Sequence, residues 1–130
     1  MKDKEVPPGF EKEIKNIAVD FDGVIHDFSK GWHDGTCYGD PLPGSIEALR
    51  ILSKKFNVII FTAKAKANRP LVNGMTGTQL VSDWLEKHNV LDCVYEITSD
   101  KPRAQLYIDD KGYRFENWLD TLKYIEENHE

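Results

Sequence analysis

Residues 17–25 form an apolar segment that carries two aspartates two positions apart, and this is the part of the chain best suited to chemistry. Such a run predicts a buried strand that delivers Asp20 and Asp22 to a tight turn at Gly23. Burying two carboxylates without a cation or hydrogen-bond donors costs several kcal/mol or makes the groups take up protons. The pair therefore indicates a site, although Asp-Gly is also an ordinary turn sequence.

Three further groups of polar residues follow other apolar segments in a fixed order. Thr62 ends the apolar residues 57–61, Lys101 comes next along the chain, and a second acidic pair, Asp109 and Asp110, ends another apolar run. A second acidic junction of this kind makes coincidence a poor explanation. Ligands of open parallel sheets bind at the carboxyl ends of the strands. We therefore expect these side chains to share one site.

Apolar residues recur at helical spacing in the segments 45–55, 78–88 and 115–125, and a further short strand is expected over 93–97. This alternation predicts an α/β fold, a doubly wound, Rossmann-like three-layer sandwich with a mainly parallel sheet and helices on both faces. The segment 98–104 is short for a crossover between parallel strands, so we expect it to run extended beneath or beside the site.

Length and composition indicate one domain over 1–130, with its core at about 15–127. The chain has 130 residues, 40% of them hydrophobic and 30% charged. A chain of this length and composition can form a hydrophobic core without disulfides or a structural metal. No apolar run reaches the length of a membrane span and the N-terminal residues lack a signal-peptide core, so we expect no membrane contact and a cytoplasmic location. Cys37 and Cys93 are predicted to be free thiols. The oligomeric state stays open.

The ordered set of acid pair, threonine, lysine and acid pair resembles the haloacid dehalogenase-like (HAD) superfamily of phosphohydrolases. The segment Asp20-Phe21-Asp22-Gly23-Val24 matches the first motif of that family, Asp-x-Asp-x-(Thr/Val), and is the most specific part of the resemblance. The three later motifs are short, and they are matched by Thr62, by Lys101, and by Asp109 with Asp110.

The resemblance implies a Mg²⁺-dependent phosphatase that hydrolyses a phosphomonoester through an aspartyl-phosphate intermediate. Asp20 would be the nucleophile, and Asp22 would protonate the leaving oxygen and then deprotonate water. The side chains of Asp20 and Asp109 and the backbone carbonyl of Asp22 would bind Mg²⁺, with Asp110 binding directly or through water. Like charges crowded at about 4 Å cost about 4 kcal/mol per pair at an effective dielectric of 20, so these acids need the cation.

The same resemblance implies where the phosphate would bind. Thr62 and the turn amides at Gly23 would hold the phosphate oxygens. Lys101 would offset the remaining negative charge, and Lys64, just beyond Thr62, is the competing candidate for that role.

The substrate is less well defined by the sequence. The intervals 26–42 and 63–77, where many HAD relatives carry a cap domain, are predicted loops, so we expect an open site without a separate cap. The net charge of −5 disfavours broad nucleic-acid binding. Trp32 and Tyr38 could stack on a base or pin their loop to the core. A basic rim would suit a nucleotide, a polynucleotide end or another anionic phosphorylated molecule. Its members are Lys64, Lys66, Arg69, Lys101, Arg103, Lys111 and Arg114.

Other functions agree less well with the sequence than a phosphatase does. A receiver-like phosphoacceptor signalling domain also combines acids, a threonine and a lysine, but it needs a strand-ending aspartate before the threonine, and none lies between Asp22 and Thr62. A non-catalytic HAD-like binding module would usually have lost an acid of the first motif. The chain has no P-loop motif. The dipeptides His26-Asp27 and His33-Asp34 suggest a second metal site, but we interpret them as loop polarity.

Overall fold

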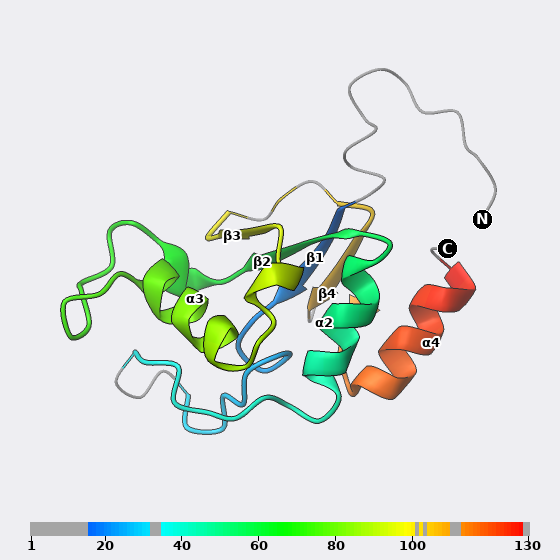
Figure 1. The fold of residues 1–130 in the computed structure, drawn as a ribbon, viewed down its shortest axis with the longest axis horizontal. Coiled ribbons are helices and arrows are strands. Elements are labelled where there is room, and N and C mark those ends of the chain that lie inside the picture. The colour runs from blue at the N-terminus through cyan, green and yellow to red at the C-terminus, as the bar shows by residue number, and fades with distance from the viewer. Residues whose placement is uncertain (1–15, 32–34, 101, 103, 110–112, 129–130) are drawn as a thin grey trace, which may run out of the picture.

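The computed structural model describes residues 16–31, 35–100, 102, 104–109 and 113–128, and is drawn in Figure 1. Its sheet has five strands in the order β3-β2-β1-β4-β5, and every neighbouring pair is parallel. The strands are β1 (Asn16–Asp20), β2 (Asn57–Phe61), β3 (Glu96–Thr98), β4 (Leu106–Asp109) and β5 (Tyr113–Arg114). The predicted α/β, Rossmann-like fold class with a parallel sheet is confirmed, and the described residues form no cap domain. The sequence predicts helices on both faces, whereas the described helices share one core on a single face, because the connection from β3 to β4 is too short for a helix.

In the described part of the chain, three α-helices connect or follow these strands: α2 (Ser45–Ser53), α3 (Gly77–Lys87) and α4 (Trp118–Asn128). Helix α2 begins after Gly44, whose φ of +81° is left-handed. Helix α3 begins with a capping box, in which Thr76 and Gln79 satisfy each other's backbone N–H groups. Two short 3₁₀ turns, η1 (Ala63–Ala65) and η2 (Leu91–Cys93), complete the elements named here.

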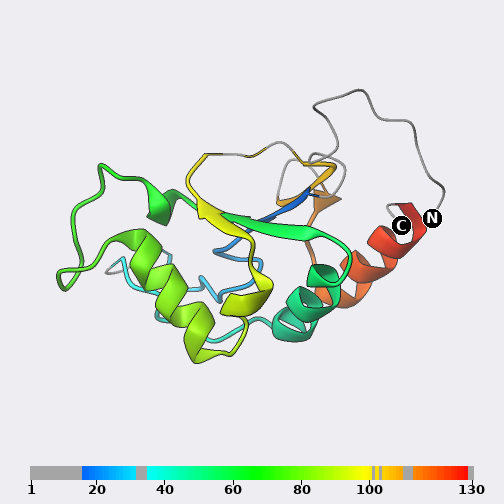
Figure 2. The same ribbon diagram turned by 45° about the horizontal axis from the view of Figure 1, so that its top comes forward.

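The hydrophobic core lies between the sheet and the helices. Figure 2 shows α2, α3 and α4 side by side along one face of the sheet. Alternate strand residues point into this layer because strand side chains have a period of two. The fully or nearly buried members of the core include Ile17, Val19, Val58, Ile60, Leu106, Ile108, Leu49, Leu85 and Trp118.

The opposite face of the sheet is covered partly by the connection from β3 to β4. The register pairs Ala18 with Ile59 on one side and with Tyr107 on the other. The Tyr107 hydroxyl donates to the Pro102 carbonyl at 2.6 Å and accepts from the Ala104 N–H at 3.2 Å. The connections β1-α2-β2 and β2-α3-β3 run along the helical face. A right-handed connection from β3 back past β1 runs in the opposite direction along the sheet, so it must cross this face. The sequence predicts that 98–104 runs extended beneath or beside the site. The described part of it beyond β3 forms no helix, and its Pro102 and Ala104 bond to Tyr107 on this face of the sheet.

One predicted strand is displaced. The sequence predicts a strand over 93–97, but residues 91–93 form the turn η2. Bonding to β2 begins with the Tyr95 N–H, which donates to the Val58 carbonyl at 2.7 Å, and β3 itself covers Glu96–Thr98. The N–H groups of Cys93 and Val94 donate to Val90 and Leu91 carbonyls in this turn, so they are not free to join the sheet. Among the described residues, no helix has both the length and the apolar character needed to span a bilayer.

The anchoring of the β3–β4 connection can be tested at Tyr107. We expect Tyr107→Phe to lower the free energy of unfolding by about 1–2 kcal/mol, because it removes two hydrogen bonds from a half-buried hydroxyl. Tyr95→Phe is the matched control, since Tyr95 is 61% exposed. Urea denaturation of both variants measures the difference, and equal stabilities would contradict this role of Tyr107.

Candidate functional site at the carboxyl edge of the sheet

The strand order reverses between β1 and β4. From β1 the chain adds β2 and β3 on one side, and then returns to place β4 on the other side of β1. Open α/β sheets bind ligands in the crevice outside the carboxyl ends at such a point. Asp20 ends β1 and Asp109 ends β4. The register pairs Val19 with Ile108, so the two aspartates that follow lie side by side at this reversal.

A tight turn follows Asp20 and fixes the position of Asp22. The N–H groups of Val24, Ile25 and His26 all donate to the Phe21 carbonyl, at 3.0–3.3 Å. Gly23 adopts a φ of +83° and donates its N–H to the His26 carbonyl at 2.8 Å. Only glycine takes this conformation without strain. The turn brings His26 back beside Asp22.

The carboxylate of Asp22 is bound on both oxygens. Lys64 Nζ donates to Oδ2 at 3.0 Å, and His26 Nδ1 lies 3.0 Å from Oδ1. Lys64 is only 1% exposed and His26 is fully buried. A buried ammonium is costly unless it has a charged partner, and Asp22 is that partner. The ammonium also lies 4.8 Å from the ring centroid of Phe28, a cation–π contact.

Thr62 positions Lys64. It follows β2 and is 4% exposed, and its Oγ1 accepts from the Lys64 N–H at 3.2 Å, which begins the turn η1. The Thr62 N–H donates to the Thr98 carbonyl at 2.9 Å. On the other side, a Cβ on Gly77 would lie only 1.5 Å from the Lys64 carbonyl oxygen. Helix α3 therefore packs directly on the Lys64 backbone and fixes the direction of this side chain.

The structure brings most of the predicted site residues to one edge. Asp20, Asp22, Thr62 and Asp109 all lie at the carboxyl ends of the three central strands, and Gly23 lies in the turn between them. The competing lysine, Lys64, also lies here. The predicted residues Lys101 and Asp110 are outside the described residues, as are Trp32, His33 and Asp34, so those predictions stay open.

One interpretation of the sequence was wrong, because loop polarity does not account for His26. Its imidazole is buried, stacks on the Phe21 ring at 5.0 Å between centroids, and contacts Asp22. The available signal was the apolar pair Val24-Ile25 before it, which marks a buried segment.

Tyr38 holds its loop in place, because its hydroxyl donates to the Gly31 carbonyl and accepts from the Lys30 N–H.

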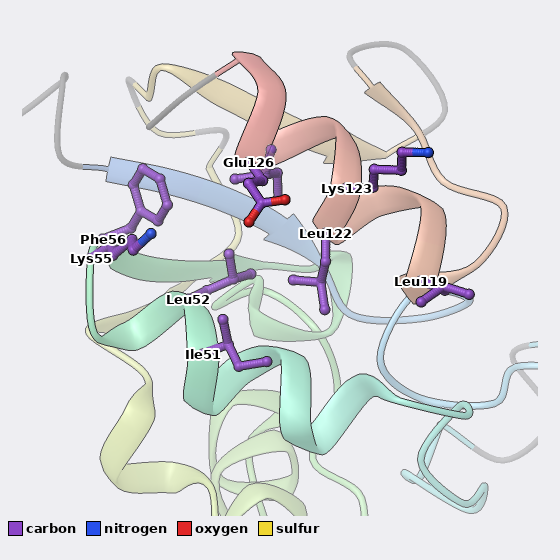
Figure 3. A pocket seen from close by; sticks show the side chains of 9 residues that line it. Ile51, Leu52, Lys55, Phe56, Leu119, Leu122, Lys123 and Glu126 are labelled. Carbon is purple, nitrogen blue, oxygen red and sulfur yellow. The ribbon is translucent and has the colours of Figure 1, made fainter. Parts of the chain in front are cut away.

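Cavities provide little further guidance to the site. A cavity of about 370 Å³ lies between α2 and α4, where Ile51, Leu52 and Leu122 point into the space between the helices (Figure 3). It belongs to the helical layer and none of its lining residues is at the carboxyl edge. A smaller cavity of about 140 Å³ adjoins Lys64 and is bordered by Arg69 and Leu80.

Neither the comparisons with known proteins nor the arrangement of possible metal ligands identifies this site, so its function is inferred from the chemistry of its residues. Comparisons with protein-family models, with curated proteins and with solved structures find no significant match to this chain. Within the described part of the chain, no three His, Cys, Asp or Glu side chains gather closely enough to hold a metal ion. Asp20 accepts the Phe21 N–H at 2.8 Å and is half-buried, and Asp109 is 5% exposed.

The coupling between Asp22 and Lys64 can be measured by a double-mutant cycle. We expect Lys64→Met to lower the free energy of unfolding by about 2–3 kcal/mol, because Asp22 is left partly buried without its cation. In the Asp22→Asn background the same change should cost at least about 1 kcal/mol less. Urea denaturation of the four proteins gives the coupling energy, and simple additivity would contradict a functioning ion pair.

Cys37 gives a second test of this environment. Burial raises the pKa of the Cys37 thiol to about 12, with a smaller lowering by Lys64 and a smaller raising by Asp22. The thiol therefore stays protonated at neutral pH, and the thiolate is the reactive form. We expect iodoacetamide at pH 8 to alkylate Cys37 more than about a hundred-fold more slowly in the native protein than in urea. Mass spectrometry of the labelled peptides measures this, and native labelling as fast as in urea would contradict it.

Proposed function

We propose that this chain is a HAD-like phosphatase that hydrolyses a phosphomonoester through a phosphoryl group carried on Asp20. The observation that supports the proposal best is the meeting of Asp20, Asp109 and the Asp22–Lys64 pair at the strand-order reversal. Acid pairs alone would be ordinary turn residues. Their place at the reversal, together with a buried lysine, favours a site that handles an anion.

In the proposed reaction, the Asp20 carboxylate attacks phosphorus and the bond from phosphorus to the ester oxygen breaks. Asp22 must be in its protonated form in the substrate complex; it gives this proton to the leaving oxygen, and the alcohol departs. Asp22 then removes a proton from water, which attacks the aspartyl phosphate. Inorganic phosphate leaves and the Asp20 carboxylate is restored.

We further propose Mg²⁺ as the cofactor. Asp20 and Asp109 offer adjacent hard carboxylate oxygens, and Mg²⁺ is usually held by one or two carboxylates, with waters and substrate phosphate completing the shell. Both Asp22 side-chain oxygens are already bound by His26 and Lys64, which leaves its backbone carbonyl for the metal. Asp110 is a further proposed ligand. When bound, the ion would neutralise the charge between the acids and the phosphate.

The proposed phosphate contacts are Thr62, the turn amides at Gly23, and a lysine. Lys64 suits the lysine role because its ammonium already lies 3.0 Å from Asp22, within the proposed site. Lys101 remains the other candidate. Lys66 and Arg69 are exposed on the neighbouring loop, and we propose that they favour a nucleotide, a polynucleotide end or another anionic substrate.

The strand order can be compared with that of a receiver-like phosphoacceptor signalling domain, the alternative to a phosphatase. Receiver domains have the order 2-1-3-4-5, in which the third strand, and not the fourth, lies next to the first strand on its other side. This sheet has the order 3-2-1-4-5, the same as the first five strands of the usual Rossmann order. A receiver-like signalling domain is therefore the weaker proposal.

Steady-state kinetics with an aryl phosphate test the proposal. We expect hydrolysis that requires Mg²⁺ and falls by about a thousand-fold or more in Asp20→Asn, because the nucleophile is lost. Asp109→Asn should shift the Mg²⁺ concentration needed for half-maximal rate upward by at least about ten-fold. Asp83→Asn, an exposed site on α3, is the matched control. Full activity in excess chelator, or in Asp20→Asn, would refute the proposal.

A further inference from the structure

A continuous series of hydrogen bonds leads from the helical layer to Asp22. Trp84 of α3, 5% exposed, donates its Nε1–H to the Gly39 carbonyl at 2.9 Å. The Gly39 N–H in turn lies 2.8 Å from His26 Nε2, and His26 Nδ1 lies 3.0 Å from Asp22 Oδ1. Three residues from three separate parts of the chain, Trp84, Gly39 and His26, are thus connected to Asp22, the acid of the proposed mechanism.

The direction of each bond follows from which groups can donate. A backbone N–H only donates, so His26 Nε2 must accept from Gly39 and carries no proton. The ring proton of the neutral imidazole is therefore on Nδ1, where it donates to Asp22 Oδ1. The Gly39 peptide thereby selects the tautomer that can support the carboxylate.

The surrounding structure holds the imidazole in one orientation. Its ring stacks on Phe21 with an interplanar angle of 7° and meets the Trp84 ring edge-on at 5.5 Å. The segment that carries Gly39 is fixed by backbone bonds from Asp27 to Asp40 and from Leu42 to Ile25. A Cβ on Gly39 would lie 2.1 Å from the Asp27 carbonyl oxygen, so this close approach requires glycine.

We propose that His26 is a positioning residue for Asp22, and that the Trp84–Gly39–His26 series fixes the direction of the acid's proton-transferring carboxylate. The proposal rests on the proposed phosphatase function. Lys64 alone leaves Asp22 free to rotate about its last bond, because one ion pair fixes only one oxygen. The second bond, from His26 Nδ1, removes that freedom, so Asp22 meets the leaving oxygen in one orientation.

Two substitutions at one position separate positioning from packing. In His26→Asn the amide nitrogen takes the place of Nδ1 and can still donate to Asp22, whereas in His26→Gln the amide group takes the place of Nε2 and can bond only to Gly39. Both variants lose the ring and its stacking on Phe21. They are therefore matched controls for each other.

We expect His26→Gln to lower kcat/KM for an alkyl phosphate by about ten- to a hundred-fold, because that leaving group needs a proton from Asp22. The loss should be smaller for an aryl phosphate with a good leaving group, and His26→Asn should stay within a few-fold of the parent on both substrates. Equal losses in the two variants and on the two substrates would indicate packing alone and overturn the proposal.

The tautomer can be measured without any activity. In ¹⁵N NMR of the unliganded parent protein, His26 should show a protonated Nδ1 and an unprotonated Nε2. A proton on Nε2 would overturn the proposal even if both variants unfolded. If the protein hydrolysed no phosphate ester, the catalytic part would fail with the proposed function, whereas the NMR result would still decide whether Gly39 sets the tautomer.

Discussion

The buried ion pair between Asp22 and Lys64 is the interaction on which the arrangement of this edge depends. Lys64 is 1% exposed, and Asp22, 3.0 Å away, offsets the cost of burying its charge. Replacing a buried pair by apolar residues is often neutral for stability, and the pair is better explained by what it orients than by what it stabilises. It joins the turn after β1 to the turn after β2, and so fixes the two halves of the site relative to each other.

Each partner of the pair is held by its own local structure. Thr62 begins the turn that directs Lys64, and helix α3 packs on the Lys64 backbone through Gly77. Gly23 allows the turn that returns His26 to Asp22. These are backbone requirements, and they explain why glycines and a threonine stand at these positions, in addition to the phosphate contacts proposed for Thr62 and for the turn at Gly23.

The sequence predicted the fold class and the edge, because strand and helix periodicity depends on local spacing and because strand ends carry the acids. It left two lysines as candidates, since a single lysine in a loop has no periodic signal; the structure places Lys64 at the edge, and Lys101 lies outside the described residues. It missed His26 because a histidine in a glycine-rich stretch looks polar until its tertiary partners, Gly39 and Trp84, are known. The strand at 93–97 was displaced because turn η2 uses the N–H groups that the pattern assigns to the sheet.

The most direct test of the account is to trap the phosphorylated protein. Rapid acid quench during turnover of an aryl phosphate, followed by peptide mass spectrometry, shows which side chain carries the phosphoryl group. The account predicts one phosphoryl group on Asp20, absent in Asp20→Asn. Turnover with the phosphoryl group on another residue, or with none on any residue under conditions that accumulate intermediate, would contradict it.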